Sequence, residues 1–408
     1  MRLVDTNERL AKRIQSLSRD SIFVYPILSS LTKHSAQTRV SSLIVSDGDI
    51  DLFINYHNID SELVSTEIDF SGFKQVFVYK LKDFLYHYKG PTSNLYDFEA
   101  GLFHSAKDYE VDEGVIYTIF RRRQAPRAND LIPIWKHYEE FLKWKNLMSQ
   151  NATSRFSQLY PKSLFYIEKN GINTINGIEY TNYNFLTTTS RPSNAFGGIN
   201  YAALKKDGET RTRFVSRFDG GKLYQLDFDG YHIRLIGKLI GVEIPLDIKA
   251  HKWLANQYGV DDSTAKGITF RQLYGGVQDE YKHIPFFQKT SDYIEYVWDN
   301  FKTNRYVETP ILKRKITWSE DLNKNKLFNY ILQSVETERN IIIIDKLSQL
   351  KESKSLPVLY TYDSLLFDVH PSDGVEYVKE IKSIMESGGY PTEVEVGDNY
   401  KDMVKVSI

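Results

Sequence analysis

The sequence contains no cysteine, so neither disulfide bonds nor thiolate metal sites are available to it. It also has no apolar run long enough to span a membrane, and its first twenty residues are too highly charged for a secretory signal. We therefore expect a cytoplasmic protein, located in the host cytoplasm if its source is a virus. We expect no association with a membrane.

An excess of charge of either sign is missing as well. The 52 Lys and Arg residues balance the 53 Asp and Glu residues to a net charge of −1, which indicates no general affinity for nucleic acid. Basic residues do cluster at 121–123, at Arg211, Arg213 and Arg217, and at 313–315. Taken alone, each cluster is more typical of a solvated surface than of a phosphate-binding track.

The chain is long enough for more than one domain. Its 408 residues, 41% of them apolar, suffice for two or three domains with ordinary cores. The polar stretch 124–130, which contains a proline, is the best candidate linker, and a helix is predicted after it over 134–148. Before the linker, a mixed α/β module is predicted with strands over 23–28, 40–45, 51–56 and 115–120 and a helix over 81–88.

The stretch KLYQLDFDGYHIR, residues 222–234, is the most informative. Apolar and aromatic residues from Leu223 to Phe228 predict a strand, and the helical spacing after Tyr231 predicts a helix. Asp227 is therefore expected where a strand stops and its carboxylate is free to leave the sheet. A lone Asp in such a place more often caps a helix or a turn, so the chemistry requires a partner.

Residues 358–369, VLYTYDSLLFDV, supply that partner. They form two apolar β-rich runs interrupted at Asp363, which predicts a hairpin with an acid in its turn. Two carboxylates presented from neighbouring strand ends suit a two-metal site, because two Mg²⁺ ions roughly 3.5–4 Å apart clamp the attacking and leaving oxygens of a phosphoryl displacement. The pattern indicates phosphoryl transfer.

A helical segment between these two acids carries a regular row of side chains. Lys266, Phe270 and Tyr274 fall four residues apart and share one helix face, with 275–276 ending the helix. A cation, a ring and a phenol in a row suit the triphosphate, sugar and base of a nucleotide. An amphipathic helix with core aromatics fits the same pattern.

Two other segments carry polar side chains suited to nucleic acid. Residues 180–220 are dense in turn formers and hydroxyls, with Arg191 and Asn200 able to reach base edges or sugars. Asn329 and Gln333 form a polar pair on a long, largely apolar helix expected over 324–350. Such amides suit minor-groove acceptors, and equally a buried pair that satisfies itself.

In this order the segments resemble motifs of the family A DNA polymerases, the group of bacterial DNA polymerase I and many phage replicative enzymes. DFDGYHIR is similar to motif A (DYSQIELR), KGITFRQLYGG to motif B and YDSLLFDV to motif C (HDELIFEV). TTTSRPSN with GGIN resembles TATGRLSS with LQNIP, YVETPILKRK resembles YVET-x-x-GRRR, FNYILQ resembles FN-x-x-x-Q, and VEVGDNY resembles VxVGxNW. The ordered matches cover more than half of the chain.

The resemblance implies an α/β (α+β) fold shaped like a right hand, and a template-directed DNA polymerase that adds deoxynucleotides to a primer 3′-hydroxyl. It assigns catalysis to Asp227 and Asp363 and metal binding to these acids and the Phe228 carbonyl, with two Mg²⁺ ions as cofactors and Mn²⁺ as a possible substitute. It assigns the incoming nucleotide to His232, His251, Lys266, Phe270 and Tyr274, and the primer-template to Arg191, Asn200, Arg314, Asn329 and Gln333.

The chain departs from the family at the residue that excludes ribonucleotides. The family's Glu in motif A falls on His232, so that exclusion must rest on another bulky group such as Tyr231, or be weaker. We hypothesise that His232 reaches Tyr274 and fills the same space. Equal incorporation of ribonucleotides and deoxynucleotides would refute this.

Three further departures concern charge and sugar selection. The family's triphosphate-binding Arg falls on Asp262, which removes a charge-assisted contact, and Arg271 lies on the wrong part of the helix to replace it. In motif C the residue after the Asp is Ser364, which removes a third carboxylate. Phe270, where some family members carry Tyr, implies poor use of dideoxynucleotides.

The resemblance also divides the chain. Residues 181–408 are expected to form palm and fingers, and 126–180 a linker and a reduced thumb, which implies low processivity without a processivity or replisome partner. Residues 1–125 faintly resemble a ribonuclease H-like 3′-5′ exonuclease, but the first strand lacks Asp-x-Glu, and Asp83 and Asp97 alone do not make that metal site. We expect a degenerate domain without proofreading.

Two alternatives stay open. One is a catalytically impaired relative that binds primer-template or a replisome partner, motivated by His232, Asp262 and Ser364. The other is a single-subunit RNA polymerase, although the chain is short for one and shows no evident promoter-binding domain. The sequence does not determine the oligomeric state.

Overall fold

The structure is a computed structural model. It describes residues 2–4, 6–29, 33–56, 68–104, 155–194, 199–317, 319, 321–350 and 352–408. The chain divides into two compact units, residues 1–165 and 166–408. The predicted strand over 115–120, the linker and the helix over 134–148 lie outside the described residues. The domain boundaries expected at 125 and 180 stay predictions.

The first unit is built on a mixed six-stranded sheet in the order β1-β4-β3-β2-β5-β6. β2 pairs antiparallel with β3 and parallel with β5. The strands are β1 (Arg2–Val4), β2 (Ser21–Leu28), β3 (Val40–Ser46), β4 (Asp51–Asn55), β5 (Gln75–Val78) and β6 (Leu95–Asp97). The helices are α1 (Asn7–Gln15), a 3₁₀ turn (Ser35–Gln37), α2 (Leu81–Phe84), α3 (Phe98–His104) and α6 (Arg155–Glu168), whose last residues belong to the second unit.

The predicted strands of this unit agree with β2, β3 and β4, but the helix predicted over 81–88 covers only Leu81–Phe84. Tyr88 leaves the helical path because its hydroxyl accepts from the Phe70 amide and donates to the Pro91 carbonyl. Phe70, Phe84 and Tyr88 stack in the core formed on the sheet. Tertiary packing therefore shortens a helix that periodicity alone extends.

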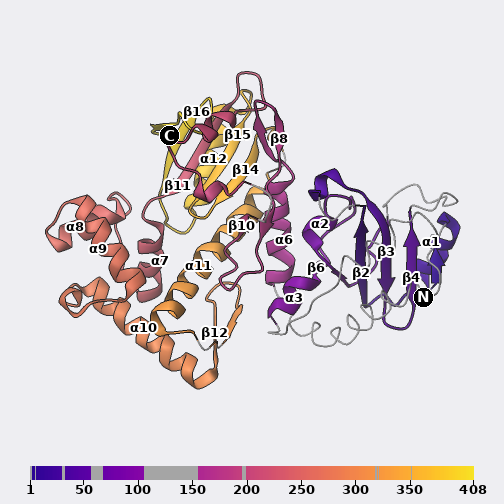
Figure 1. The fold of residues 1–408 in the computed structure, drawn as a ribbon, viewed down its shortest axis with the longest axis horizontal. Coiled ribbons are helices and arrows are strands. Elements are labelled where there is room, and N and C mark those ends of the chain that lie inside the picture. Colours follow the sequence, from indigo (N-terminus) through magenta and orange to yellow (C-terminus); the bar gives the residue numbers. More distant parts are fainter. Residues whose placement is uncertain are drawn as a thin grey trace. The chain divides into compact units, whose positions relative to one another are not determined.

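The second unit contains a five-stranded antiparallel sheet in the order β14-β15-β11-β16-β17 (Figure 1). Its strands are β11 (Lys222–Phe228), β14 (Leu356–Thr361), β15 (Ser364–Val369), β16 (Thr392–Gly397) and β17 (Val404–Val406). Short strands lie outside it: β7 (Ile172–Thr174), β8 (Gly177–Glu179), β9 (Tyr183–Asn184), β10 (Ser193–Asn194), β12 (Tyr306–Glu308) and β13 (Lys315–Thr317). β11 is central, with β15 and β16 on its two sides.

The second unit also contains α-helices. They are α7 (Tyr231–Ile240), α8 (Ala250–Tyr258), α9 (Asp262–Gly275), α10 (Pro285–Asn304), α11 (Lys324–Leu347) and α12 (Gly374–Glu386), with 3₁₀ turns at Tyr201–Ala203, Glu209–Arg213 and Asp279–Tyr281. The predicted strand and helix around Asp227 agree with β11 and α7. The long helix predicted over 324–350 agrees with α11, which is largely buried.

The connection from β11 to α7 requires glycine. Gly230 has φ +50°, and a Cβ at this position would come within 2.6 Å of the Ala250 Cβ. This close approach brings the start of α8 against the end of β11. The Asp229 carboxylate strengthens the junction, because it accepts from the Ala250 amide at 2.9 Å and from Arg234 at 2.7 Å.

Candidate active site

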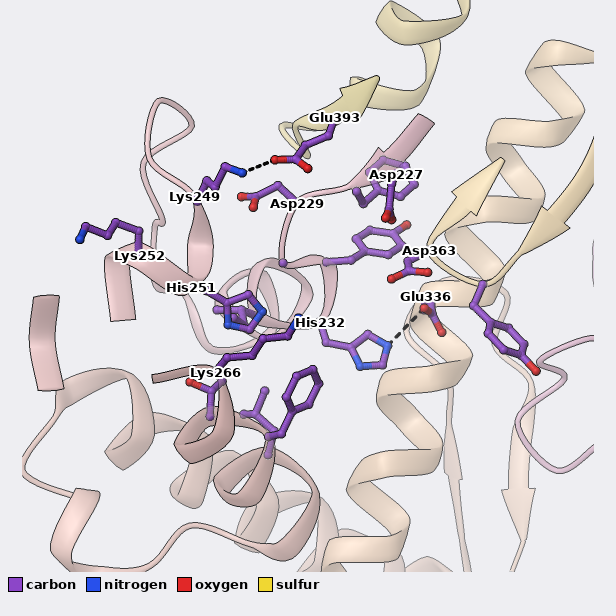
Figure 2. Close-up of a pocket in the computed structure, with 18 of the residues that line it drawn as sticks. Asp227, Asp229, His232, Lys249, His251, Lys252, Lys266, Glu336, Asp363 and Glu393 are labelled. Atoms are coloured by element: carbon purple, nitrogen blue, oxygen red, sulfur yellow. Dashed lines mark hydrogen bonds and ion pairs between the residues drawn. The ribbon is translucent and has the colours of Figure 1, made fainter. Parts of the chain in front are cut away.

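A pocket of about 550 Å³ lies in the second unit, at the end of β11 (Figure 2). One side, which we call the carboxylate wall, presents Asp227, Glu336 and Asp363 from β11, α11 and the β14–β15 turn. The other side, the lysine wall, presents Lys249, Lys252 and Lys266 together with His251, from α8, α9 and the residue before α8. The pocket thus brings together carboxylates, lysines and a histidine that are far apart in the sequence.

The sheet places the two predicted catalytic acids next to each other. Asp227 is paired across the ladder with Ser364, so it lies beside the turn that carries Asp363. The Phe228 amide donates to the Asp363 carbonyl at 3.0 Å and fixes that turn against β11. In the turn, Tyr362 has φ +61°, a conformation that costs a non-glycine residue of the order of 1–2 kcal/mol.

Two contacts hold Tyr362 in that conformation. The Asn340 side chain donates to its carbonyl, and the Arg191 guanidinium lies 3.7 Å from the centre of its ring. The strained turn is therefore supported from both α11 and the segment before β11. Such support is expected where a carboxylate must be held in one orientation.

The two acids affect each other electrostatically. Burial, and then the neighbouring Asp363 charge, raises the pKa of Asp227 to about 7. Asp363 is exposed at the mouth of the pocket, yet the protein around its carboxyl limits its hydration and, with the Glu336 charge, raises its pKa. A buried Asp227 oxygen, Oδ1, has no hydrogen-bond partner among the described residues. Like charges held this close favour either a proton or a bound cation.

These acids fit a divalent metal site. Within the described ranges no group of three or more His, Cys, Asp or Glu side chains is arranged to hold a metal ion. Mg²⁺, however, is commonly bound by one or two carboxylates, with substrate phosphates and water completing its shell. The orphaned Asp227 oxygen and the raised pKa values of both acids agree with that donor set. The Phe228 carbonyl is adjacent in the chain.

On the lysine wall the predicted row of side chains is present. The Lys266 ammonium lies 5.9 Å from the centre of the Phe270 ring, and Phe270 and Tyr274 stack with their ring centres 5.7 Å apart. His251 approaches the same Phe270 ring at 5.9 Å. Burial, and then the Lys266 charge, lowers the pKa of His251, so this ring is neutral at neutral pH. All four side chains line the pocket.

Two lysines of this wall are paired with acids, and the sequence did not reveal it. Lys252 lies 3.3 Å from Asp262, the residue that replaces the family's Arg, and Lys249 is bonded to Glu393 of β16 (Figure 2). Within the described part of the chain, Lys266 has no carboxylate within ion-pair distance. Its ammonium is therefore the one most available to an anion entering the pocket.

Sequence reasoning also missed Glu336. Its side chain is only 1% exposed, and its two oxygens lie 3.3 Å from His232 Nε2 and 3.1 Å from Arg191 Nε. His232 is bonded through Nδ1 to the Tyr274 hydroxyl, as hypothesised. A signal for Glu336 was present, because it follows Asn329 by seven residues and so continues the polar face of α11.

The remaining predicted DNA-binding residues have structural partners or lie elsewhere. Arg314 is buried and donates to the Thr188 carbonyl and to the Ser334 hydroxyl. Asn329 donates to the Tyr274 carbonyl at 3.2 Å and ties α11 to α9. Neither Asn200 nor Gln333 lines the pocket.

No protein-family model matches the chain, and no curated protein matches its sequence. No helix in the described ranges is long and apolar enough to cross a membrane. Among solved structures, the chain is similar to the polymerase domain of Pol1 from M. smegmatis, solved in complex with a DNA primer-template and a dNTP. That match has a TM-score of 0.69 and 12% sequence identity, and covers 98% of this chain and 99% of that chain. The chain therefore has the fold of a family A DNA polymerase domain, which confirms, at the level of the fold, the resemblance drawn from its motifs.

Proposed function

We propose that the chain is a template-directed DNA polymerase that adds deoxynucleotides to a primer 3′-hydroxyl. The observation that carries the proposal is the meeting of Asp227 and Asp363 in one pocket with the row Lys266, Phe270 and Tyr274. The solved relative from M. smegmatis, which binds a primer-template and a dNTP, has the same fold and supports the same substrates.

Asp227 and Asp363, with the Phe228 carbonyl, would hold two Mg²⁺ ions, for which Mn²⁺ is a possible substitute. When bound there, such ions would supply neutralisation of phosphate charge and stabilisation of the attacking and leaving oxygens. The protein's own contribution is a fixed carboxylate pair, since β11 and the strained β14–β15 turn hold both acids before substrate arrives. Positioning and charge neutralisation supply most of the rate in such a site.

The lysine wall would bind the incoming nucleotide. Lys266 would contact the triphosphate as a cation, and the neutral His251 ring would donate a hydrogen bond to it. Phe270, a residue that is 42% exposed, would stack on the sugar and base. Tyr274 would lie beneath the template base, and its hydroxyl bond to His232 supports a fixed ring orientation.

The primer-template would lie along the side of the pocket that Arg191 lines. Asn200, Asn329, Gln333 and Arg314 are proposed as further contacts. The bonds of Arg314 and Asn329 inside the fold favour a supporting role, in which they hold the elements that face DNA. The reduced thumb falls on residues outside the described ranges, so low processivity without a partner stays a prediction.

The first unit is proposed to lack proofreading. The Asp97 carboxylate is buried and accepts from the Leu81 and Ala100 amides, and Asp83 accepts from the Ser35 hydroxyl. Both carboxylates therefore have structural hydrogen-bond partners within the first unit. On the first predicted strand, Phe23 packs edge-on against Phe98 at 4.6 Å. These contacts favour a structural role for this degenerate exonuclease-like unit.

The alternative is a relative that binds primer-template without polymerising. The specific observation in its favour is Asp262, because its pairing with Lys252 offsets one cation of the lysine wall. Primer extension on a defined template, with deoxynucleotides and ribonucleotides offered separately, tests both hypotheses. Extension with deoxynucleotides that is abolished in Asp227→Asn supports the polymerase. Template binding without any extension supports the alternative, and extension with ribonucleotides alone would indicate an RNA polymerase.

A further inference from the structure

Glu336 is a buried carboxylate inside the pocket for which the proposed reaction has no assigned use. It is 1% exposed. Burial, and then the Glu336 charge, raises the pKa of both Asp363 and Tyr274. Burying a charge in this way is costly unless partners compensate it. The partners are Arg191, whose Nη2 donates at 3.3 Å, and His232, whose Nε2 lies at 3.3 Å.

The His232 ring is consequently held from two directions. His232 is on α7, and the Tyr274 hydroxyl of α9 is bonded to its Nδ1. Glu336 of α11 lies on the side of its Nε2 (Figure 2). Because a carboxylate accepts hydrogen bonds, Glu336 favours the tautomer that carries its proton on Nε2. Nδ1 is then the acceptor for the Tyr274 hydroxyl. Three helices therefore fix the orientation of one imidazole.

The ring stands where the sugar of an incoming nucleotide would be. Along α9 the side chains run from Lys266 through Phe270 to Tyr274, and His232 adjoins Tyr274 at the end away from Lys266. A nucleotide with its phosphates between Lys266 and the two aspartates would turn its sugar toward this end of the row. The imidazole then limits the space beside the sugar. A ring held in one orientation excludes a 2′-hydroxyl more effectively than a ring that can rotate.

We propose that Glu336 is a positioning residue that holds the His232 imidazole against the incoming sugar, so that selection of deoxyribose over ribose depends on Glu336. This inference rests on the proposed polymerase function. Without Glu336 the ring keeps only its bond to Tyr274 and can rotate away, which makes room for a 2′-hydroxyl. Arg191 does not substitute for Glu336, because it lies over the Tyr362 ring and cannot accept a proton from His232.

The test compares single-nucleotide insertion of a deoxynucleotide and the matching ribonucleotide. We expect Glu336→Ala to lower the ratio of the two kcat/KM values about tenfold, because the imidazole loses the buried carboxylate that lies 3.3 Å from its Nε2. Glu336→Gln, which keeps the shape and an acceptor, should lower it less. Glu338→Gln is the matched control, because Glu338 is buried on the same helix outside the pocket, and its ratio should stay at the wild-type value.

The double variant His232→Ala/Glu336→Ala separates positioning from a general structural effect. Once His232 is absent, removal of Glu336 should change the ratio no further. An unchanged ratio in a folded Glu336→Ala protein would overturn the proposal, as would a loss that persists undiminished in the His232→Ala background.

An activity-independent readout distinguishes failure of this inference from failure of the proposed function. Imidazole nitrogen chemical shifts should show one His232 tautomer, protonated on Nε2, in the wild type and a mixture in Glu336→Gln. A wild type that inserts neither nucleotide refutes the polymerase proposal, whatever these shifts show. Mixed tautomers already in the wild type refute the positioning role, whatever the activity.

Discussion

The carboxylate wall and the lysine wall of the pocket differ in how firmly the chain holds them. Asp227 and Asp363 are fixed by a β-ladder and a supported strained turn, and Glu336 is buried on α11. The lysines extend from α8, from α9 and from the residue before α8 on long side chains. The Lys252 and Asp262 side chains are 54% and 59% exposed. One wall is rigid before substrate binds, whereas the other can exchange its partners at little cost.

This difference suits the two tasks of a nucleotidyl transfer site. The chemical step needs acids held within a fraction of an ångström, since small misplacements of reacting groups are costly. Triphosphate binding needs charge more than geometry, because lysine acts as a mobile point charge. We therefore expect substitutions on the carboxylate wall to act on kcat and those on the lysine wall to act mainly on KM.

The largest effect is expected at the paired acids. Asp227→Asn and Asp363→Asn should each reduce the rate of primer extension at least about 10³-fold, because a metal contributes several kcal/mol to the transition state. Rapid-quench extension assays measure the loss. Asp398→Asn, an exposed acid paired with Lys222 outside the pocket, is the control and should keep wild-type activity. Similar losses of activity in all three variants would contradict a specific role of Asp227 and Asp363 in the chemical step.

The next effect is expected at Lys266. Lys266→Ala should lower kcat/KM for the deoxynucleotide about 10- to 100-fold, the value of a hydrogen bond to a charged group, with most of the change in KM. Steady-state insertion kinetics measure both constants. Lys289→Ala on α10, outside the pocket, should have no effect. A pure kcat effect at Lys266 would show that the lysine wall shares the rigidity of the opposite wall.

The raised pKa of Asp227 predicts a pH dependence of stability in the metal-free protein. Its folded-state pKa of about 7 lies above the ordinary value of 3.8, so between these values only the folded chain holds the proton. The free energy of unfolding should therefore fall as pH rises through this interval and level off above pH 7. Urea denaturation should show a shallower fall for Asp227→Asn. Identical slopes in the two proteins would contradict the close pairing of the acids.

The smallest effect is expected at the exposed pair on the lysine wall. Lys252→Ala should raise KM for the deoxynucleotide by up to about fivefold, and Asp262→Asn should lower it by a similar factor, because exposed pairs contribute at most about 1 kcal/mol. kcat should change little in either. The exposed pair Lys302 and Asp299 on α10 provides the matched control. A rise in KM for Lys252→Ala together with a fall in KM for Asp262→Asn would show that the ion pair with Asp262 weakens the contact of Lys252 with the triphosphate. A change of KM in the same direction in both variants would contradict this.

Local patterns predicted the elements that carry the chemistry. The strand and helix around Asp227, the hairpin at Asp363 and the shared face of Lys266, Phe270 and Tyr274 agree with the structure. Each depends on residues close together in the sequence, where periodicity and turn chemistry decide. The resemblance in motif order then correctly indicated the fold.

The contacts between distant segments were not predictable in the same way. Glu336 was overlooked because its importance lies in its burial against His232 and Arg191, neither of which is near it in the chain. The pairing of Asp262 with Lys252 joins two helices, and the sequence indicated only that a cation was missing. The short helix α2 shows that packing around Tyr88 overrides local propensity.

Binding of Mn²⁺ in the presence of a deoxynucleotide, followed by electron paramagnetic resonance, tests the central claim most directly, because it asks whether Asp227 and Asp363 act as one metal site. We predict that the wild type and Asp398→Asn bind the ion equally and that Asp227→Asn and Asp363→Asn each lose most of that binding. Wild-type binding retained in either of the last two variants would contradict a shared metal site and, with it, the proposed chemistry.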